Sequence, residues 1–89
     1  MEFEDGVRDD ILKRLRRVQG QIGGLVTMVD DGRSCDEVVT QLAAAAKALD
    51  RVGFKIVASG LQQCSTAELA GATPEVSREQ LEKLFLSLA

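Results

Sequence analysis

Two long stripes of apolar residues constrain the fold of this chain more than any other feature. The first consists of Ile11, Leu15, Val18, Ile22, Leu25 and Val29, and the second of Val38, Leu42, Ala45, Leu49, Val52 and Ile56. Both have a 4-3-4-3-4 spacing, which places every member on one face of an α-helix. We therefore expect two long helices that pack along their lengths.

Local signals set the ends of the helices. The first should stop at Asp30 and the residues after it, where two acids precede a glycine. Ser34 and Glu37 match a capping box at the start of the second helix. The third helix begins either at Thr73, which precedes a proline, or at a second capping box that starts with Ser77. We predict one all-α domain over residues 1–89, with helices at about 5–30, 35–64 and 75–88.

The second helix is apolar on two sides, which means that it needs two partners. Its other apolar row consists of Val39, Ala43, Ala46, Gly53, Val57 and Leu61. The first helix can cover one side, and we expect another chain to cover the other. The chain has 89 residues, no Trp or Tyr and three Phe, so it lacks large core-filling side chains. We predict a three-helix protomer that forms an antiparallel four-helix-bundle dimer, and two such dimers that form a tetramer.

Two cysteines, Cys35 and Cys64, lie 29 residues apart within the second predicted helix. At the rise of an α-helix this separation is about 43 Å, far beyond the reach of a disulfide or a shared metal. Within one chain the thiols cannot meet, but Cys35 can face Cys64 of a second chain across a two-fold axis. Cys35 stands at the helix N-terminus, which favours an anion. The alternative is two unrelated cysteines buried as small apolar residues.

The residue types present argue against catalysis. The chain has no histidine, no Cys-x-x-Cys and no glycine-rich phosphate loop, so we expect no enzyme activity. A structural zinc site needs about four ligands, and two thiols fall short. A two-thiolate copper(I) site at Cys35 and Cys64 is conceivable, because soft thiolates suit that ion. We prefer a redox-sensitive thiol pair without a metal or cofactor.

The net charge is −3, yet the basic residues are clustered. Arg14, Arg16 and Arg17 lie close together on the first helix, and Arg51 lies near the middle of the second. Arginine suits phosphate contacts, so we predict a DNA-binding surface. The alternatives are a solvated helix face, or a scaffold or adaptor that binds only proteins. The acidic N-terminus carries no signal peptide and no segment is long enough for a membrane span, so we expect a cytoplasmic protein.

Three blocks of this sequence resemble the CsoR/RcnR family of repressors, which sense copper, nickel, formaldehyde or persulfide. The blocks are Arg14–Gln21, which reads R-L-R-R-V-Q-G-Q, the segment from Cys35 to Leu42, and Leu49–Cys64. The resemblance implies an all-helical dimer that stacks into a tetramer and binds operator DNA without a helix-turn-helix. It also implies that Arg14 and Arg51 contact DNA, with Arg16 and Arg17 as helpers.

One position departs from the copper-sensing members of this family. They carry a histidine four residues before the second cysteine, where this chain has Gly60. Two cysteines without histidine are similar to the persulfide-sensing CstR branch. We therefore predict that reactive sulfur species release the repressor from DNA through Cys35 and Cys64. A copper(I) sensor of reduced affinity, a formaldehyde sensor and a member that has lost sensing remain alternatives.

Overall fold

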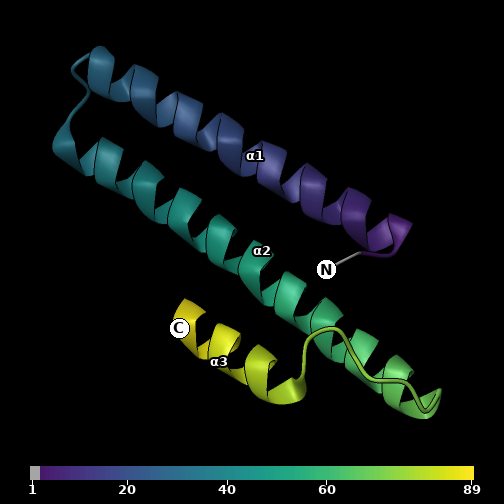
Figure 1. Cartoon of the computed structure of the whole chain (residues 1–89). Coiled ribbons are helices and arrows are strands. Elements are labelled where there is room, and N and C mark those ends of the chain that lie inside the picture. The colour runs from purple at the N-terminus through teal and green to yellow at the C-terminus, as the bar shows by residue number, and fades with distance from the viewer. Residues whose placement is uncertain (1–2) are drawn as a thin grey trace.

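The protein consists of three α-helices, as Figure 1 shows in a computed structural model that describes residues 3–89. The helices are α1 (Asp5–Asp30), α2 (Cys35–Leu69) and α3 (Arg78–Leu88). Residues 3–89 contain no strand, so the predicted all-α class with three helices is confirmed. Met1 and Glu2, which the predicted domain includes, lie outside the described residues.

Helix α2 is the centre of the structure, with α1 antiparallel along one side of it and α3 folded back along the other (Figure 1). The molecule measures 57 × 26 × 12 Å, and its radius of gyration is 16.9 Å. A compact domain of this length has a radius of gyration of about 12 Å. The protomer is therefore a single layer of helices, which leaves two broad faces of α1 and α2 without a covering layer.

The end of α2 lies beyond the predicted boundary at Cys64, because the helix continues to Leu69. The Thr66 hydroxyl donates to the Gln62 carbonyl oxygen at 3.0 Å, so this polar side chain bonds within the helix instead of breaking it. The helix stops before Gly71, whose φ of +70° ends it as glycine commonly does.

The start of α3 is set by the second of the two predicted signals. The Gln80 backbone N–H donates to the Ser77 hydroxyl at 3.1 Å, and the Ser77 N–H donates to the Gln80 side chain at 2.8 Å. This reciprocal capping box starts the helix at Arg78, later than the predicted residue 75.

The capping box predicted at Ser34 is wrong, although Ser34 is the N-cap residue of α2. Its side chain makes no capping hydrogen bond, and Glu37 instead accepts from Arg33 Nε at 2.6 Å. A hydrogen bond from Ser34 holds the pKa of the Asp36 carboxyl below its usual range, and the backbone N–H groups of Asp36 and Glu37 add to this effect. Asp36 thus accepts the hydrogen bond from the Glu37 N–H that the prediction gave to the Ser34 side chain.

Each apolar stripe has two buried residues and two or three exposed ones, and its other members, Leu25, Val38 and Ile56, are partly buried. Ile11 and Val18 of α1 are buried, as are Ala45 and Val52 of α2. Five other residues of the two stripes are exposed in the protomer, and these are Leu15, Ile22, Val29, Leu42 and Leu49. We call these five residues the open apolar face. The Ile22 side chain is 50% exposed and the Leu49 side chain is 49% exposed, and both line the same open groove. Within residues 3–89, no helix combines enough length and hydropathy to cross a membrane.

Helix α3 covers part of the second apolar row of α2, which we had expected another chain to cover. It approaches closely at two glycines. A Cβ built on Gly53 would lie 2.8 Å from the Leu88 side chain, and one built on Gly60 would lie 2.6 Å from that of Leu81. Gly53 and Gly60 are seven residues apart on α2, and Leu81 and Leu88 are seven residues apart on α3. Helix α3 therefore follows one face of α2 for two turns. Val57 is buried between them.

Candidate sensing site and basic surface

The two thiols differ sharply in their surroundings. Cys35 is the first residue of α2 and is exposed, whereas Cys64 is 0% exposed. Both belong to one unbroken helix, so the separation of about 43 Å that the helical rise implies holds in the structure. The structure does not bring the thiols together within a protomer, and neither is in a disulfide.

Cys64 is enclosed by α3 and by the connection that precedes it. Its Sγ donates to the Val76 carbonyl oxygen at 2.8 Å. The side chain belongs to a core cluster with Val57 and Leu81, and Val76 and Leu88 pack against this cluster. A reagent or ligand can reach the Cys64 sulfur only when Val76 or Leu81 moves.

Arg78 fastens the start of α3 to α2 beside this cluster. Its Nε donates to Glu68 at 2.8 Å, and its Nη2 donates to Glu68 at 3.1 Å and to Ser65 at 2.9 Å. The guanidinium lowers the pKa of the Glu68 carboxyl, and the carboxylate raises the pKa of Arg78. This contact joins the two ends of the segment that covers Cys64. The sequence analysis missed it, because it depends on how α3 docks.

Among the described residues, the thiolate donors available to a metal are Cys35 and Cys64. Across residues 3–89, no three His, Cys, Asp or Glu side chains gather as a metal site would require. Gly60 supplies no donor, and the Leu81 side chain occupies the space beside it. Two thiolates fit a soft monovalent ion of low coordination number, such as copper(I), better than they fit zinc. Because Cys35 and Cys64 lie far apart in the protomer, such an ion would need thiols from two chains.

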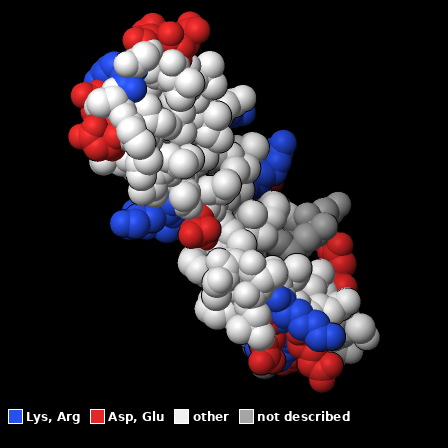
Figure 2. Space-filling model, turned by 90° about the vertical axis from the view of Figure 1, so that its left-hand side faces the viewer, with Lys and Arg blue, Asp and Glu red and all other residues white. Residues whose placement is uncertain are grey.

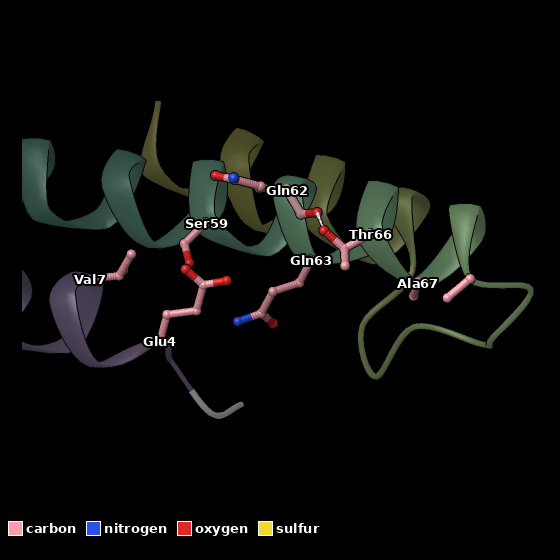
Figure 3. A pocket seen from close by; sticks show the side chains of 8 residues that line it. Glu4, Val7, Ser59, Gln62, Gln63, Thr66 and Ala67 are labelled. Atoms are coloured by element: carbon pink, nitrogen blue, oxygen red, sulfur yellow. Dashed lines mark hydrogen bonds between the residues drawn. The ribbon is translucent and has the colours of Figure 1, made fainter.

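A pocket of about 240 Å³ lies between the start of α1 and the C-terminal half of α2 (Figure 3). Its lining includes Glu4, Ser59, Gln63 and Thr66. In Figure 3 the Glu4 carboxylate points towards Ser59, and the Gln63 amide points into the pocket. Among the described residues, neither cysteine lines this pocket, so it is separate from the thiol sites.

The three predicted DNA-binding arginines of α1 fall into two groups, and the fourth, Arg51, is exposed on α2. Arg14 and Arg17 line a small pocket of about 140 Å³ with Lys13 and Asp10. Arg16 lies elsewhere, in the groove that the open apolar face forms around Leu49. The structure therefore brings Arg14 and Arg17 together but does not bring Arg16 to them.

Asp10 connects the first group to α2. Its Oδ2 accepts from Arg14 Nε at 2.9 Å and from Lys55 Nζ at 3.0 Å. Lys55 is one helical turn after Arg51, so the basic residues of α2 face the same side of that helix. The hydrogen bonds from Lys55 and then Arg14 hold the pKa of Asp10 below its usual range. The sequence analysis did not identify this bridge, because only the register of α1 on α2 reveals it.

Figure 2 shows how charge is distributed on one face of the molecule. Uncharged side chains cover much of this face, and basic side chains project on both sides near the middle. Acidic side chains gather at the two ends. Basic side chains also lie beside the acidic ones at both ends, so this view does not show a single basic patch.

A comparison with protein families identifies the class of this chain. Residues 7–87 match the family described as metal-sensitive transcriptional repressor. The chain belongs to this family. The match confirms the family-level resemblance to CsoR/RcnR repressors, and it confirms that the protein is not an enzyme, because the family consists of transcriptional repressors.

Curated relatives of this repressor-family member carry copper in their names. The copper-sensing transcriptional repressor RicR of Mycobacterium tuberculosis is 36% identical over 67 residues, which are 75% of this chain and 70% of RicR. The copper-sensing transcriptional repressor CsoR of Bacillus subtilis is 26% identical over 78 residues, which are 88% of this chain and 77% of the relative. CsoR of M. tuberculosis is 34% identical over 61 residues, which are 67% of this chain and 51% of the relative.

These relatives correct one of our expectations. We predicted that the protein works without a metal or cofactor, and this is wrong for a member of a metal-sensitive family whose relatives sense copper. The prediction relied on the missing histidine at Gly60 and gave too little weight to a site with two soft thiols. The narrower assignment to a persulfide-sensing branch gains no support from the relatives.

Proposed function

We propose that this chain is a cytoplasmic, DNA-binding transcriptional repressor that releases its operator when copper(I) binds a pair of thiols contributed by two subunits. Cys35 of one subunit and Cys64 of the partner subunit would hold the ion. The observation that carries this proposal is that a chain of a metal-sensitive repressor family has two free thiols on one unbroken helix, Cys35 at its first residue and Cys64 in its last two turns.

The surface of the protomer supports assembly. A folded chain of 9.6 kDa has a typical accessible surface of about 5,100 Å². This protomer exposes 6556 Å². The excess of roughly 1,400 Å² per chain is larger than the ~800 Å² that each partner buries in a standard interface. We therefore propose an antiparallel dimer formed through the open apolar face, and a tetramer of two dimers.

The antiparallel arrangement explains how two distant thiols could form one site. A two-fold axis near the middle of the Cys35–Cys64 segment places each end of α2 beside the opposite end of its mate. Copper(I) would supply a link between subunits there. The chain's own residues control access to the Cys64 sulfur, because Val76 or Leu81 has to move before an ion can reach it. Ligand binding would thus disturb the docking of α3 on α2. The phosphates of the operator DNA would be bound by Arg14, Arg17 and Arg51.

A DNA-binding experiment tests the repressor assignment. Duplexes that the protein retains from a random-sequence pool provide an operator, and the affinity is measured as a function of salt. Arg14→Ala should weaken binding at least tenfold, whereas Arg8→Ala, an exposed arginine on another face of α1, serves as the matched control. A chain that binds no duplex at moderate salt would instead be a protein-binding scaffold.

Copper(I) titration of the same complex tests the inducer. We expect release of DNA at about one ion per thiol pair, and no release when either Cys35 or Cys64 is replaced by serine. Mass measurement under native conditions should find the ion between two chains and not on a monomer. Tight binding of copper(I) by a double Cys→Ser variant would contradict the proposed site.

Reactive sulfur is a second candidate inducer, which the geometry at Gly60 favours. Leu81 fills the space where a third metal ligand would stand, whereas a thiol pair needs no third ligand. In this alternative the Cys35 thiolate attacks a polysulfide, whose S–S bond breaks and leaves a persulfide on Cys35. The Cys64 thiolate of the partner subunit then attacks that persulfide, and hydrosulfide leaves. The product is a reducible covalent dimer, which copper(I) does not give.

A further inference from the structure

We propose that Asp10 is a positioning residue of the DNA-binding surface, and that it holds Arg14 of α1 and Lys55 of α2 together as one phosphate-binding unit. This inference rests on the proposed repressor function. It adds Lys55 to the arginines that the sequence analysis assigned to DNA, and it gives a role in DNA binding to an acidic residue.

The Asp10 carboxylate lies between cationic side chains of two helices. One carboxylate oxygen, Asp10 Oδ2, accepts from Arg14 Nε at 2.9 Å and from Lys55 Nζ at 3.0 Å. Arg14 belongs to the helix of Asp10, whereas Lys55 belongs to the neighbouring helix. The carboxylate therefore fixes two cationic groups, from two helices, within hydrogen-bonding distance of the same atom.

Both cations keep hydrogen-bond donors that Asp10 does not use. Arg14 uses only its Nε towards Asp10, so both terminal NH2 groups can still donate to a phosphate. Lys55 uses one of its three N–H donors. Lys13 and Arg17 line the same pocket as Arg14 and Asp10. Three cations against one anion leave this pocket positively charged, and Lys55 adds a further cation at its edge.

An acid in this basic surface orders the cations more than it stabilises the fold. The side chains of Asp10, Arg14 and Lys55 are 35%, 43% and 41% exposed, so their ion pairs add little to the stability of the fold. Arginine and lysine lose much rotamer freedom when they bind a phosphate. A carboxylate that orders both in the free protein removes part of that loss. The cost is one negative charge near DNA, which the cations outnumber.

Asp9 provides a matched control for the test. It is adjacent to Asp10, carries the same charge and is exposed on α1. Both Asp9→Asn and Asp10→Asn remove one negative charge near DNA, which by itself tightens binding slightly. If Asp10 positions its two partners, Asp10→Asn should instead bind the selected duplex about three- to tenfold more weakly than Asp9→Asn. The slope of log affinity against log salt should fall by about one to two, since Arg14 and Lys55 neutralise fewer phosphates.

A double-mutant cycle separates positioning from a general loss of structure. In an Arg14→Ala, Lys55→Gln background Asp10 has nothing to hold, so Asp10→Asn and Asp9→Asn should act alike. Helicity and oligomeric state, measured on every variant, should stay unchanged. Equal affinities of the two single variants, or tighter binding by Asp10→Asn, would overturn the proposal. If the wild-type chain binds no duplex at moderate salt, the proposed DNA-binding function itself fails, which is a different result.

Discussion

Replacing Gly60 with alanine tests the packing that encloses Cys64. A Cβ at this position would lie 2.6 Å from one methyl carbon of Leu81 and 3.4 Å from the other. Real Cβ contacts are not this short, so Leu81 must move. It is only 2% exposed and packs in the cluster with Cys64, so it cannot simply turn into solvent.

The expected magnitude is a balance of two effects. Overpacking a core contact costs about 1–3 kcal/mol. Alanine in place of glycine favours the helix by up to about 1 kcal/mol. Gly20→Ala is the matched control, because a Cβ there has nothing within 4 Å in the protomer and only the helix effect remains. The two variants should therefore differ in free energy of unfolding by about 1–3 kcal/mol, with Gly60→Ala the less stable.

Alkylation of the thiols measures where the destabilisation acts. The strain falls on the contact between α2 and α3, so local opening of α3 should become more frequent. A change of about 1–3 kcal/mol raises the open population about 5- to 160-fold, and the alkylation rate of Cys64 should rise by the same factor. Cys35 in the same chain is the internal standard, and protomer concentration is held constant because assembly contributes to stability. A Gly60→Ala variant that equals Gly20→Ala in both stability and Cys64 reactivity would refute the close packing of Leu81.

Three further outcomes follow from the geometry. In the wild-type protein, Cys35 should react with an alkylating reagent at least a hundredfold faster than Cys64, and the two rates should converge in denaturant; comparable native rates would show that α3 does not cover Cys64. The Arg78–Glu68 contact should be fully present above the ordinary pKa of glutamate, about 4.3, and lost as the pH falls through the lowered pKa of Glu68, so NMR titration should find a midpoint below 4.3 that Arg78→Gln returns to the ordinary value. Arg14→Ala should lower the slope of log affinity against log salt by about one, and an unchanged slope would place Arg14 away from phosphate.

The sequence predicted the long helices well because their apolar stripes repeat over many turns. The same periodicity cannot say which half of a stripe is buried within the protomer. Ile11 and Val18 are buried while Leu15 and Ile22 are open, and this difference depends on which side of α1 packs against α2. The stripe therefore predicted that partners exist, but not which residues face which partner.

The candidate site was harder to predict, because its details depend on tertiary contacts. Both cysteines could be singled out from their spacing, but only the docking of α3 makes Cys64 inaccessible. The sequence showed Gly60 as a missing ligand, whereas the structure shows it as the place where Leu81 packs. Two start signals for α3 had similar local strength, and the one at Ser77 is used. The ion pair between Asp10 and Lys55 could not be predicted from the sequence, because it depends on the register in which α1 packs against α2.

The close approach of Leu81 to Gly60 also restricts how a repressor of this kind could change its inducer during evolution. A histidine at position 60 would add a third ligand next to Cys64, but its Cβ would meet the Leu81 side chain. If the histidine at position 60 came first, the intermediate protein would have a strained contact between this histidine and Leu81. In the other order, a smaller residue at position 81 first opens the space and exposes Cys64, and the new ligand then fills it. The accessible path therefore begins on α3, at a residue that itself binds nothing.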